Sequence, residues 1–174
     1  MAAPSEEVIA SAREQGLVAD RLSHTIDRDT YTPALLGLLN NMLVWSGARL
    51  FQHAHGVGTN EWRIISALAN HPGSTASDLC EVLGLNKSIA SKSVAELVSR
   101  GFVAQLVGPR ASRHLFLTQD GERVHDDLMP IARERERILQ ASLSPDEVAQ
   151  LNALLVRMLE AEDALTRYEK DITG

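Results

Sequence analysis

The segment GLNKSIASKSVAELVSRGFV, residues 84–103, decides the fold and raises the first question about function. The chain has 174 residues and a formal net charge of −6, yet this segment is basic. Between Lys87 and Arg100 it holds three basic residues and one acid, Glu96, and serine or alanine fills most of the other non-apolar positions. A short basic surface with small side chains, in an acidic chain, indicates contact with a negatively charged partner.

The basic charge extends beyond this segment. From Gly84 to Phe116 the chain has five Lys or Arg residues and one acid, a net charge of +4, so the other 141 residues carry −10. The five basic residues are Lys87, Lys92, Arg100, Arg110 and Arg113. The acidic balance of the whole chain argues against diffuse binding to nucleic acid, but a local reversal of sign is what a focused DNA-contact surface requires.

Residues 87–99 have the spacing of an amphipathic helix. One face carries the apolar side chains Ala90, Val94, Leu97 and Val98, which we expect to pack on the preceding helix. The opposite face carries Ser88, Ser91, Lys92 and Ala95, which are small, hydroxylated or basic. Small side chains let a helix enter a major groove about 12 Å wide, where Ser and Lys meet phosphates or base edges. The alternative is an ordinary solvated helix with a few lysines.

The neighbouring segments favour the first interpretation. Thr75 and Asp78 form a capping-box pattern that starts a short helix ending at Gly84, and Asn86 is placed to cap the next helix, which Gly101 ends. Two β-like runs then follow, Phe102–Val107 and His114–Leu117, around a Gly-Pro turn. A helix-turn-helix followed by a hairpin with Arg110 and Arg113 near its tip predicts a wing that reaches a neighbouring groove or the DNA backbone.

The rest of the chain is helical in pattern. Thr32-Pro33 begins a long Leu-rich helix that ends at HGVG (55–58), Thr59 caps a second, Thr118 begins a densely charged one, and Ser144-Pro145 starts the last. Ser5 is placed to start a short helix ending near Gly16. Aromatic residues make up only 4% of the chain, which argues against a β-sandwich or barrel. The predicted fold class is mainly α with a small β-hairpin wing.

The run NEWRIISALANHPGSTASDLCEVLGLNKSIASKSVAELVSRGFVAQL, followed by HLFLTQDGERV, resembles the MarR family of winged-helix regulators. The resemblance covers roughly residues 33–165 and implies a homodimer. It implies an N-terminal extension at 1–32, a helical dimerisation region at 33–57 and 119–174, and a winged helix-turn-helix lobe at 58–118. Groove-facing positions would be Lys87, Ser88, Ile89, Ser91 and Lys92.

One departure from the family concerns the wing. The family's wing usually carries an Asp-x-Arg pattern, whereas GPRASRH supplies Arg110 and Arg113 without an Asp. Either arginine is a candidate for the minor-groove contact, or the wing is short and binds mainly phosphate. The resemblance implies a repressor that a small effector, such as an aromatic acid, releases from a pseudo-palindromic operator. The single cysteine, Cys80, leaves no intrachain disulfide and predicts a reducing, cytoplasmic setting.

A candidate effector site lies on the first long helix, where Asn41, Trp45, Arg49 and His53 recur at spacings of four. An arginine and a tryptophan in Leu-rich sequence are suited to a small aromatic carboxylate. The alternative places Trp45 in the dimer core and Arg49 near the helix C-terminus as a structural residue.

Other functions have less support. The sequence has no Gly-rich phosphate loop, GxSxG or HExxH motif, so we expect no enzyme, and we expect no cofactor. The single cysteine, Cys80, is expected to be buried and structural, with a redox sensor as the alternative. His53 and His55 do not share a helical face, which argues against a metal site with His71 and His125. No apolar run is long enough to span a membrane. A helical dimer that binds another protein remains the non-DNA alternative.

Overall fold

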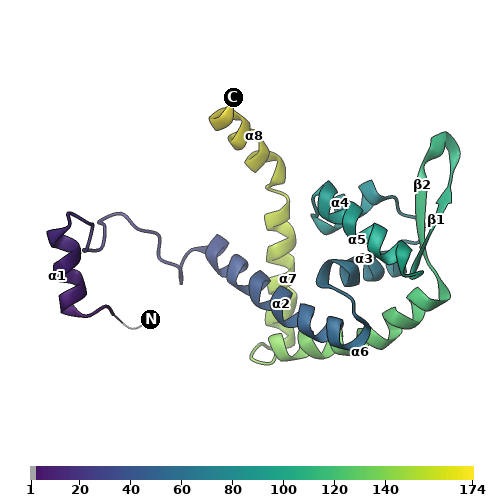
Figure 1. Cartoon of the computed structure of the whole chain (residues 1–174), viewed down its shortest axis with the longest axis horizontal. Coiled ribbons are helices and arrows are strands. Elements are labelled where there is room, and N and C mark those ends of the chain that lie inside the picture. Colours follow the sequence, from purple (N-terminus) through teal and green to yellow (C-terminus); the bar gives the residue numbers. More distant parts are fainter. Residues whose placement is uncertain (1–2) are drawn as a thin grey trace. The chain divides into compact units, whose positions relative to one another are not determined.

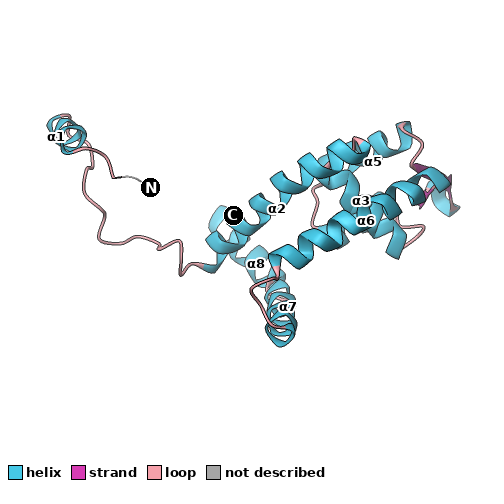
Figure 2. Cartoon of the chain, turned by 90° about the horizontal axis from the view of Figure 1, so that it is seen from below, coloured by secondary structure: helices cyan, strands magenta, loops and turns pink. Residues whose placement is uncertain are grey.

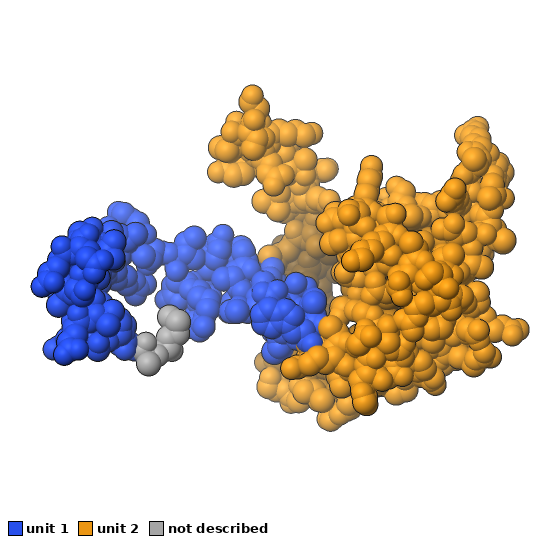
Figure 3. Space-filling model, viewed as in Figure 1, with its two compact units in different colours: residues 1–45 blue, residues 46–174 orange. Residues whose placement is uncertain are grey.

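The computed structural model describes residues 3–174 as helices joined to one two-stranded hairpin (Figures 1 and 2). The elements, in chain order, are α1 (Glu6–Glu14), α2 (Thr32–His55), α3 (Thr59–Asn70), α4 (Ala76–Leu83), α5 (Lys87–Ser99), β1 (Val103–Val107), the 3-10 turn η1 (Pro109–Ala111), β2 (Arg113–Leu117), α6 (Gln119–Leu139), α7 (Pro145–Leu159) and α8 (Glu162–Thr173). The chain divides into two compact units, residues 1–45 and 46–174, which Figure 3 colours separately. The fold class predicted from the sequence is confirmed.

The first unit contains α1 and the N-terminal part of α2. Ser5 is the N-cap of α1, Glu6 and Glu7 lie in its first turn, and Gly16 follows the helix with φ of +72°. The acids favour a helix N-terminus because they complement the partial positive charge of its free N–H groups. The short helix expected after Ser5 is therefore confirmed. Residues 17–31 form neither helix nor strand in the structure.

The second unit has its hydrophobic core among α3, α4, α5, the hairpin and α6. The fully buried side chains are Phe51, Val57, Ile64, Ile65, Leu68, Leu79, Leu97, Leu115 and Leu128. The ring of Phe51 lies 5.3 Å from that of Trp62, tilted by 37°. Burying this many aliphatic side chains supplies the main driving force for folding, since each contributes about 1.5–3 kcal/mol.

Local capping groups define the helix-turn-helix. Thr75 and Asp78 form the expected capping box at the start of α4, Gly84 ends that helix with φ of +59°, and Asn86 Oδ1 accepts a hydrogen bond of 2.8 Å from the Ile89 N–H. Glycine suits the position after α4 because it adopts left-handed backbone angles without a steric cost. These three predictions are confirmed.

Two predicted caps lie one position away. Thr32 and Thr59 are the first residues of α2 and α3 rather than their N-caps, and Gly58 is the N-cap of α3. The Glu61 carboxylate lies against Gly58, where a Cβ would collide with it unless the side chain moved.

The hairpin pairs β1 with β2 in an antiparallel register from Val103↔Leu117 to Val107↔Arg113. Its base is fixed at two places. Thr118 closes it by donating two hydrogen bonds to the residues just before β1, from Oγ1 to the Gly101 oxygen at 2.7 Å and from its N–H to the Phe102 oxygen at 3.0 Å. The N–H of Leu115 also donates to the Ser74 oxygen at 3.0 Å. The predicted hairpin is confirmed, and β2 begins one residue earlier than expected.

Helix α6 begins at the foot of the hairpin and continues through Pro130 to Leu139. Its N-terminal turn packs so closely on Phe102, the residue before β1, that a Cβ on Gly121 would overlap the Phe102 carbonyl oxygen. Residues 46–55 of α2 run beside α6 (Figure 2), with Ser46 Oγ 3.1 Å from Arg135 Nη2 and His55 Nε2 3.0 Å from Asp127 Oδ2.

The C-terminal region is two helices rather than the single last helix expected from the sequence. Ser144 and Glu147 form a capping box at the start of α7, as the Ser-Pro-Asp-Glu pattern predicts. α7 ends at Leu159, and α8 starts at Glu162 after a tight turn in which the Ala161 N–H donates to the Met158 oxygen. None of the helices formed by residues 3–174 combines the length and the apolar character that crossing a bilayer requires.

Candidate nucleic-acid interface

Helix α5 has the orientation predicted from its sequence. Ala90, Val94 and Leu97 are buried in the core, at 1%, 4% and 0% exposure. Ser88, Ser91, Lys92 and Ala95 are exposed on the other side, and so are Lys87 and Ile89 at the N-terminal end. The five predicted groove-facing residues therefore share an exposed surface, which we call the α5 face: Lys87, Ser88, Ile89, Ser91 and Lys92.

A buried serine on α5 was not anticipated. Ser93 is 4% exposed, and its Oγ donates a hydrogen bond of 2.5 Å to Glu61 Oε1 on α3. A hydrogen bond to a charged group is stronger than a neutral one, so this contact fixes α5 on α3. The helical spacing could have predicted that Ser93 is buried, since it lies three residues after Ala90 and four before Leu97, on the same helical face.

Arg100 is the second residue that the sequence interpretation missed. We counted its charge with the basic segment, but its guanidinium is half-buried and turned inward. Nη1 donates to the Gly56 oxygen and Nη2 to the His55 oxygen, both at 2.6 Å, and the group lies 4.6 Å above the Phe102 ring. The last carbonyl groups of a helix lack partners within the helix and carry partial negative charge. Arg100 therefore caps the C-terminus of α2, and its charge is already engaged inside the lobe.

A groove of about 670 Å³ separates α5 from the wing and the start of α4. Its lining is rich in hydroxyl groups, and Arg113 is the cation among its lining residues. The residues are Thr75, Ala76, Ser77, Ser91, Val94, Ala95, Val98, Ser99, Gln105, Ser112, Arg113 and Leu115. The groove brings the α5 face and the wing together on one surface, with Ser91 on one wall and Arg113 on the other. Figure 1 shows the hairpin extending past α5 on this side.

The two wing arginines occupy different positions. Arg113 lies at the last pair of the hairpin, opposite Val107. Arg110 lies at the exposed tip, where it and Ala111 have φ values of +59° and +60°. Left-handed angles cost an L residue roughly 1–2 kcal/mol. The tip is therefore a strained turn, which is closed by the hydrogen bond of 2.8 Å from the Gly108 N–H to the Ser112 oxygen.

The four residues of the candidate effector site lie on the surface of the single chain. Asn41, Trp45, Arg49 and His53 are all exposed, and Trp45 is 68% exposed. A ligand at this helix face would need a second surface to enclose it. Their role in binding an effector stays a prediction.

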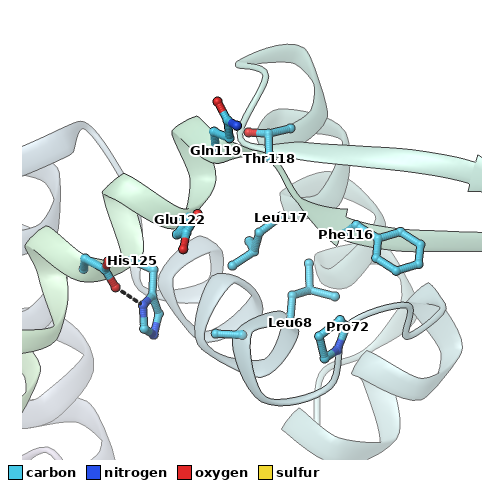
Figure 4. A pocket seen from close by; sticks show the side chains of 10 residues that line it. Leu68, Pro72, Phe116, Leu117, Thr118, Gln119, Glu122 and His125 are labelled. Atoms are coloured by element: carbon cyan, nitrogen blue, oxygen red, sulfur yellow. Dashed lines mark hydrogen bonds and ion pairs between the residues drawn. The ribbon is translucent and has the colours of Figure 1, made fainter.

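A separate pocket of about 460 Å³ lies between α3, β2 and the start of α6 (Figure 4). Leu68, Pro72, Phe116 and Leu117 form its apolar part, and Figure 4 shows Glu122 and His125 reaching it from α6. The His125 ring stacks on Trp62 at 5.8 Å. The pocket lies away from α5, so it adds nothing to the DNA-facing surface.

The remaining candidates are Cys80 and the histidines. Cys80 is half-buried rather than fully buried, because its neighbour Leu79 takes the core position on α4. His55 and His125 each contact an aspartate of α6, Asp127 and Asp126 respectively. Within residues 3–174 no three His, Cys, Asp or Glu side chains are grouped as a metal site would need.

Comparison with known proteins gives the same fold. Residues 55–114 match the family model described as "MarR family". The HTH-type transcriptional regulator PetP of Rhodobacter capsulatus is 31% identical over 108 residues, which cover 61% of this chain and 65% of PetP. The matched region thus spans less than two thirds of that relative.

Solved structures extend the likeness over more of the chain. A MarR/EmrR family transcriptional regulator from Acinetobacter sp. ADP1 is 26% identical, with a TM-score of 0.75 over 80% of this chain and 99% of that one. MepR of S. aureus, solved as a complex with DNA, has a TM-score of 0.69 at 18% identity over 78% of this chain and 99% of its own, a likeness of fold. Through its helix-turn-helix, its wing and these matches, the chain is similar to the MarR family of winged-helix proteins.

Proposed function

We propose that this protein is a DNA-binding transcriptional regulator whose contact surface consists of the α5 face and the wing. The observation that carries the proposal is the exposed α5 face, which is basic and free of acids, beside a groove walled by Arg113. PetP is described as a transcriptional regulator and MepR was crystallised with DNA, which supports the same role here. In this role α5 enters the major groove while the wing reaches the adjacent backbone or minor groove.

The test is a DNA-binding titration by fluorescence anisotropy, using the DNA upstream of the protein's own gene and a scrambled duplex of equal length. Specific binding would favour the upstream DNA and would weaken steeply with salt, because each neutralised phosphate contributes about 0.9 to the log–log slope. Equal, weak binding to both duplexes at every salt concentration would contradict the proposal. It would favour the alternative, a winged lobe that binds another protein.

We further propose that the protein acts as a homodimer. Many large apolar side chains of α2, α7 and α8 are exposed in the single chain: Leu35, Leu38, Leu39, Met42, Trp45, Leu50, Leu151, Leu154, Met158, Leu159, Leu165 and Tyr168. Exposed apolar surface on this scale is typical of an interface. A two-fold dimer predicts a pseudo-palindromic site with half-sites about one DNA turn apart. Light scattering at micromolar concentration tests this, and a monomeric mass would contradict it.

The response to a small effector, with repression relieved by binding, is the finer part of the proposal. Arg49 offers a planar, charged group suited to a carboxylate, and Trp45, one turn away on α2, offers a ring for stacking. An effector shifts DNA affinity only through its differential affinity for two states, typically about 1–3 kcal/mol. Arg49→Ala should keep DNA binding and lose release by aromatic acids. A variant that still responds at the same ligand concentration would assign Arg49 to the scaffold.

A further inference from the structure

We propose that His114 is a positioning residue for the wing, and that its imidazole ring fixes the wing tip when both ring nitrogens carry a proton. Wing order, and with it the proposed DNA contact of the wing, would then depend on pH. The effect on DNA rests on the proposed function, whereas the effect on the wing tip does not.

The wing needs such a residue because its tip extends beyond its fixed base. Backbone hydrogen bonds hold β2 to the segment before α4 at Leu115, whose oxygen accepts from the Gly73 N–H at 2.8 Å and whose N–H donates to the Ser74 oxygen at 3.0 Å. Past this point the hairpin is two-stranded, and an isolated two-stranded hairpin is at best marginally stable in water. His114 is the next residue outward, and its Nδ1 lies 2.8 Å from the Gly73 oxygen.

The partners of the ring determine where its hydrogens lie. The Gly73 carbonyl oxygen can only accept, so Nδ1 carries a hydrogen. Nε2 lies 3.0 Å from Ser112 Oγ, and that hydroxyl donates its single hydrogen to the Pro109 oxygen at 2.9 Å. Nε2 must therefore donate as well if all three hydrogen bonds are to form together. The arrangement is complete with the imidazolium form of His114.

The neutral ring cannot satisfy the same partners. With a hydrogen on Nδ1 alone, Nε2 becomes an acceptor, and the Ser112 hydroxyl must turn from the Pro109 oxygen toward the ring. One hydrogen bond inside the tip turn is then lost. Histidine is the side chain whose charge ordinarily changes between about pH 5 and 8, so the experiment below covers that range.

The ring also packs directly against the turn that carries Arg110. A Cβ on Gly108 would lie 2.8 Å from His114 Cδ2 and 2.8 Å from Ser112 Oγ. The side-chain-free Gly108 thus lets the ring and the turn meet. The ring is held at Gly73 on one side and packs on Gly108 and Ser112 on the other, so a movement of the ring also moves the tip turn.

The charges around His114 come from three elements. Asp78 on α4 interacts electrostatically with it, and hydrogen bonds from Thr75, followed by the charge of His114, lower the pKa of that carboxyl group. Asp78 is therefore ionised at neutral pH, with a charge opposite to that of an imidazolium. Arg113 precedes His114 on β2 and Arg110 lies in the tip, so the same hairpin carries two further positive charges, while the cross-strand neighbour on β1 is the uncharged Leu106.

The first arm of the test uses the full-length protein without DNA. Nuclear magnetic resonance of the histidine ring nitrogens and amide exchange of the Gly108 N–H, corrected for intrinsic exchange rates, are followed from pH 5.5 to 8. We expect two ring N–H groups on His114 at low pH and a roughly two- to tenfold loss of Gly108 protection as the ring becomes neutral. His114→Gln should abolish this dependence, and His71→Gln, at an exposed position in the preceding loop, should retain it. Protection that is constant with pH in the wild type would overturn the inference.

The second arm measures DNA affinity at constant ionic strength over the same range. We expect the wild type to lose roughly two- to tenfold more affinity than His114→Gln between pH 6 and 8. Identical pH profiles would overturn the inference. If the wild type binds no DNA at any pH, the proposed function is wrong and the first arm alone decides on His114. If His114→Gln proves less stable to heat than the wild type, Ser112→Ala is the second variant, because it removes the acceptor of Nε2. It should also abolish the pH dependence of Gly108 amide protection.

Discussion

The guanidinium of Arg100 joins the C-terminus of α5 to the C-terminus of α2 by donating hydrogen bonds to the carbonyl oxygens of His55 and Gly56. The same His55 contacts Asp127 on α6 through its ring. Three helix segments of the second unit therefore meet at one point, and the helix proposed to contact DNA takes its position from this junction. A basic residue within a DNA-binding segment can thus act on binding without touching DNA.

Replacement of Arg100 by methionine should weaken DNA binding without changing its salt dependence. The methionine keeps most of the apolar length but leaves two helix-terminal carbonyls without their charged donor, so α5 loses its anchor on α2. DNA affinity measured at four or more salt concentrations shows whether Arg100 acts by positioning α5 or by contacting a phosphate. A log–log slope lower by about 0.9 would show instead that Arg100 contacts a phosphate.

Lys92→Ala tests the opposite situation, a basic residue of α5 that is proposed to contact DNA directly. Lys92 is exposed on the α5 face, so its loss should leave the unfolding free energy within about 0.5 kcal/mol of the wild type. If Lys92 contacts one phosphate, the slope of log affinity against log salt should fall by about 0.9. Unchanged affinity and slope would mean that this side of α5 does not face DNA.

Leu97→Ala tests the buried side of the same helix. Leu97 is 0% exposed within the hydrophobic core, so its truncation leaves a cavity that costs about 2–5 kcal/mol of unfolding free energy. Urea denaturation followed by circular dichroism measures this, and the salt slope of the remaining folded protein should match the wild type. A loss below about 1 kcal/mol would contradict the packing described for α5.

Asp78→Ala should lower stability in a pH-dependent manner. Hydrogen bonds from Thr75 lower the pKa of Asp78 in the folded chain. A group whose pKa is lower in the folded state stabilises it fully above its unfolded pKa, about 4, and loses that contribution as the pH falls below this value. The urea midpoints of the variant and the wild type should differ at pH 7 and approach each other toward pH 3. A constant difference across this range would attribute the effect to helix propensity rather than to the carboxylate.

The sequence was sufficient for features that depend on neighbouring residues. The orientation of α5 follows from the spacing of Ala90, Val94 and Leu97, and the caps at Thr75, Asn86 and Ser144 follow from the hydrogen-bonding capacity of these side chains. Both kinds of signal act within a few residues along the chain. They therefore predict helix limits and the exposed face with no knowledge of the tertiary structure.

The features that were missed depend on residues distant in sequence. Ser93 bonds to Glu61, 32 residues away, and Arg100 bonds to His55 and Gly56, 45 and 44 residues away. Nothing in a local pattern distinguishes an arginine that caps a remote helix from one that faces solvent. The candidate effector residues present the same difficulty, because enclosing exposed side chains such as Trp45 and Arg49 requires a surface that the single chain does not place over them.

The closed base of the hairpin has a consequence for how this protein can diverge. Thr118 binds back to Gly101 and Phe102, and Gly121 packs on the Phe102 carbonyl, so the two ends of the wing are joined to each other independently of its tip. Val103 and Leu115 remain part of the core, but residues 106–113, farther out, are exposed or half-buried. Insertions, deletions or substitutions in that outer part can alter what the tip reaches while the helical body keeps its architecture. Evolution can thus retarget the wing separately from α5.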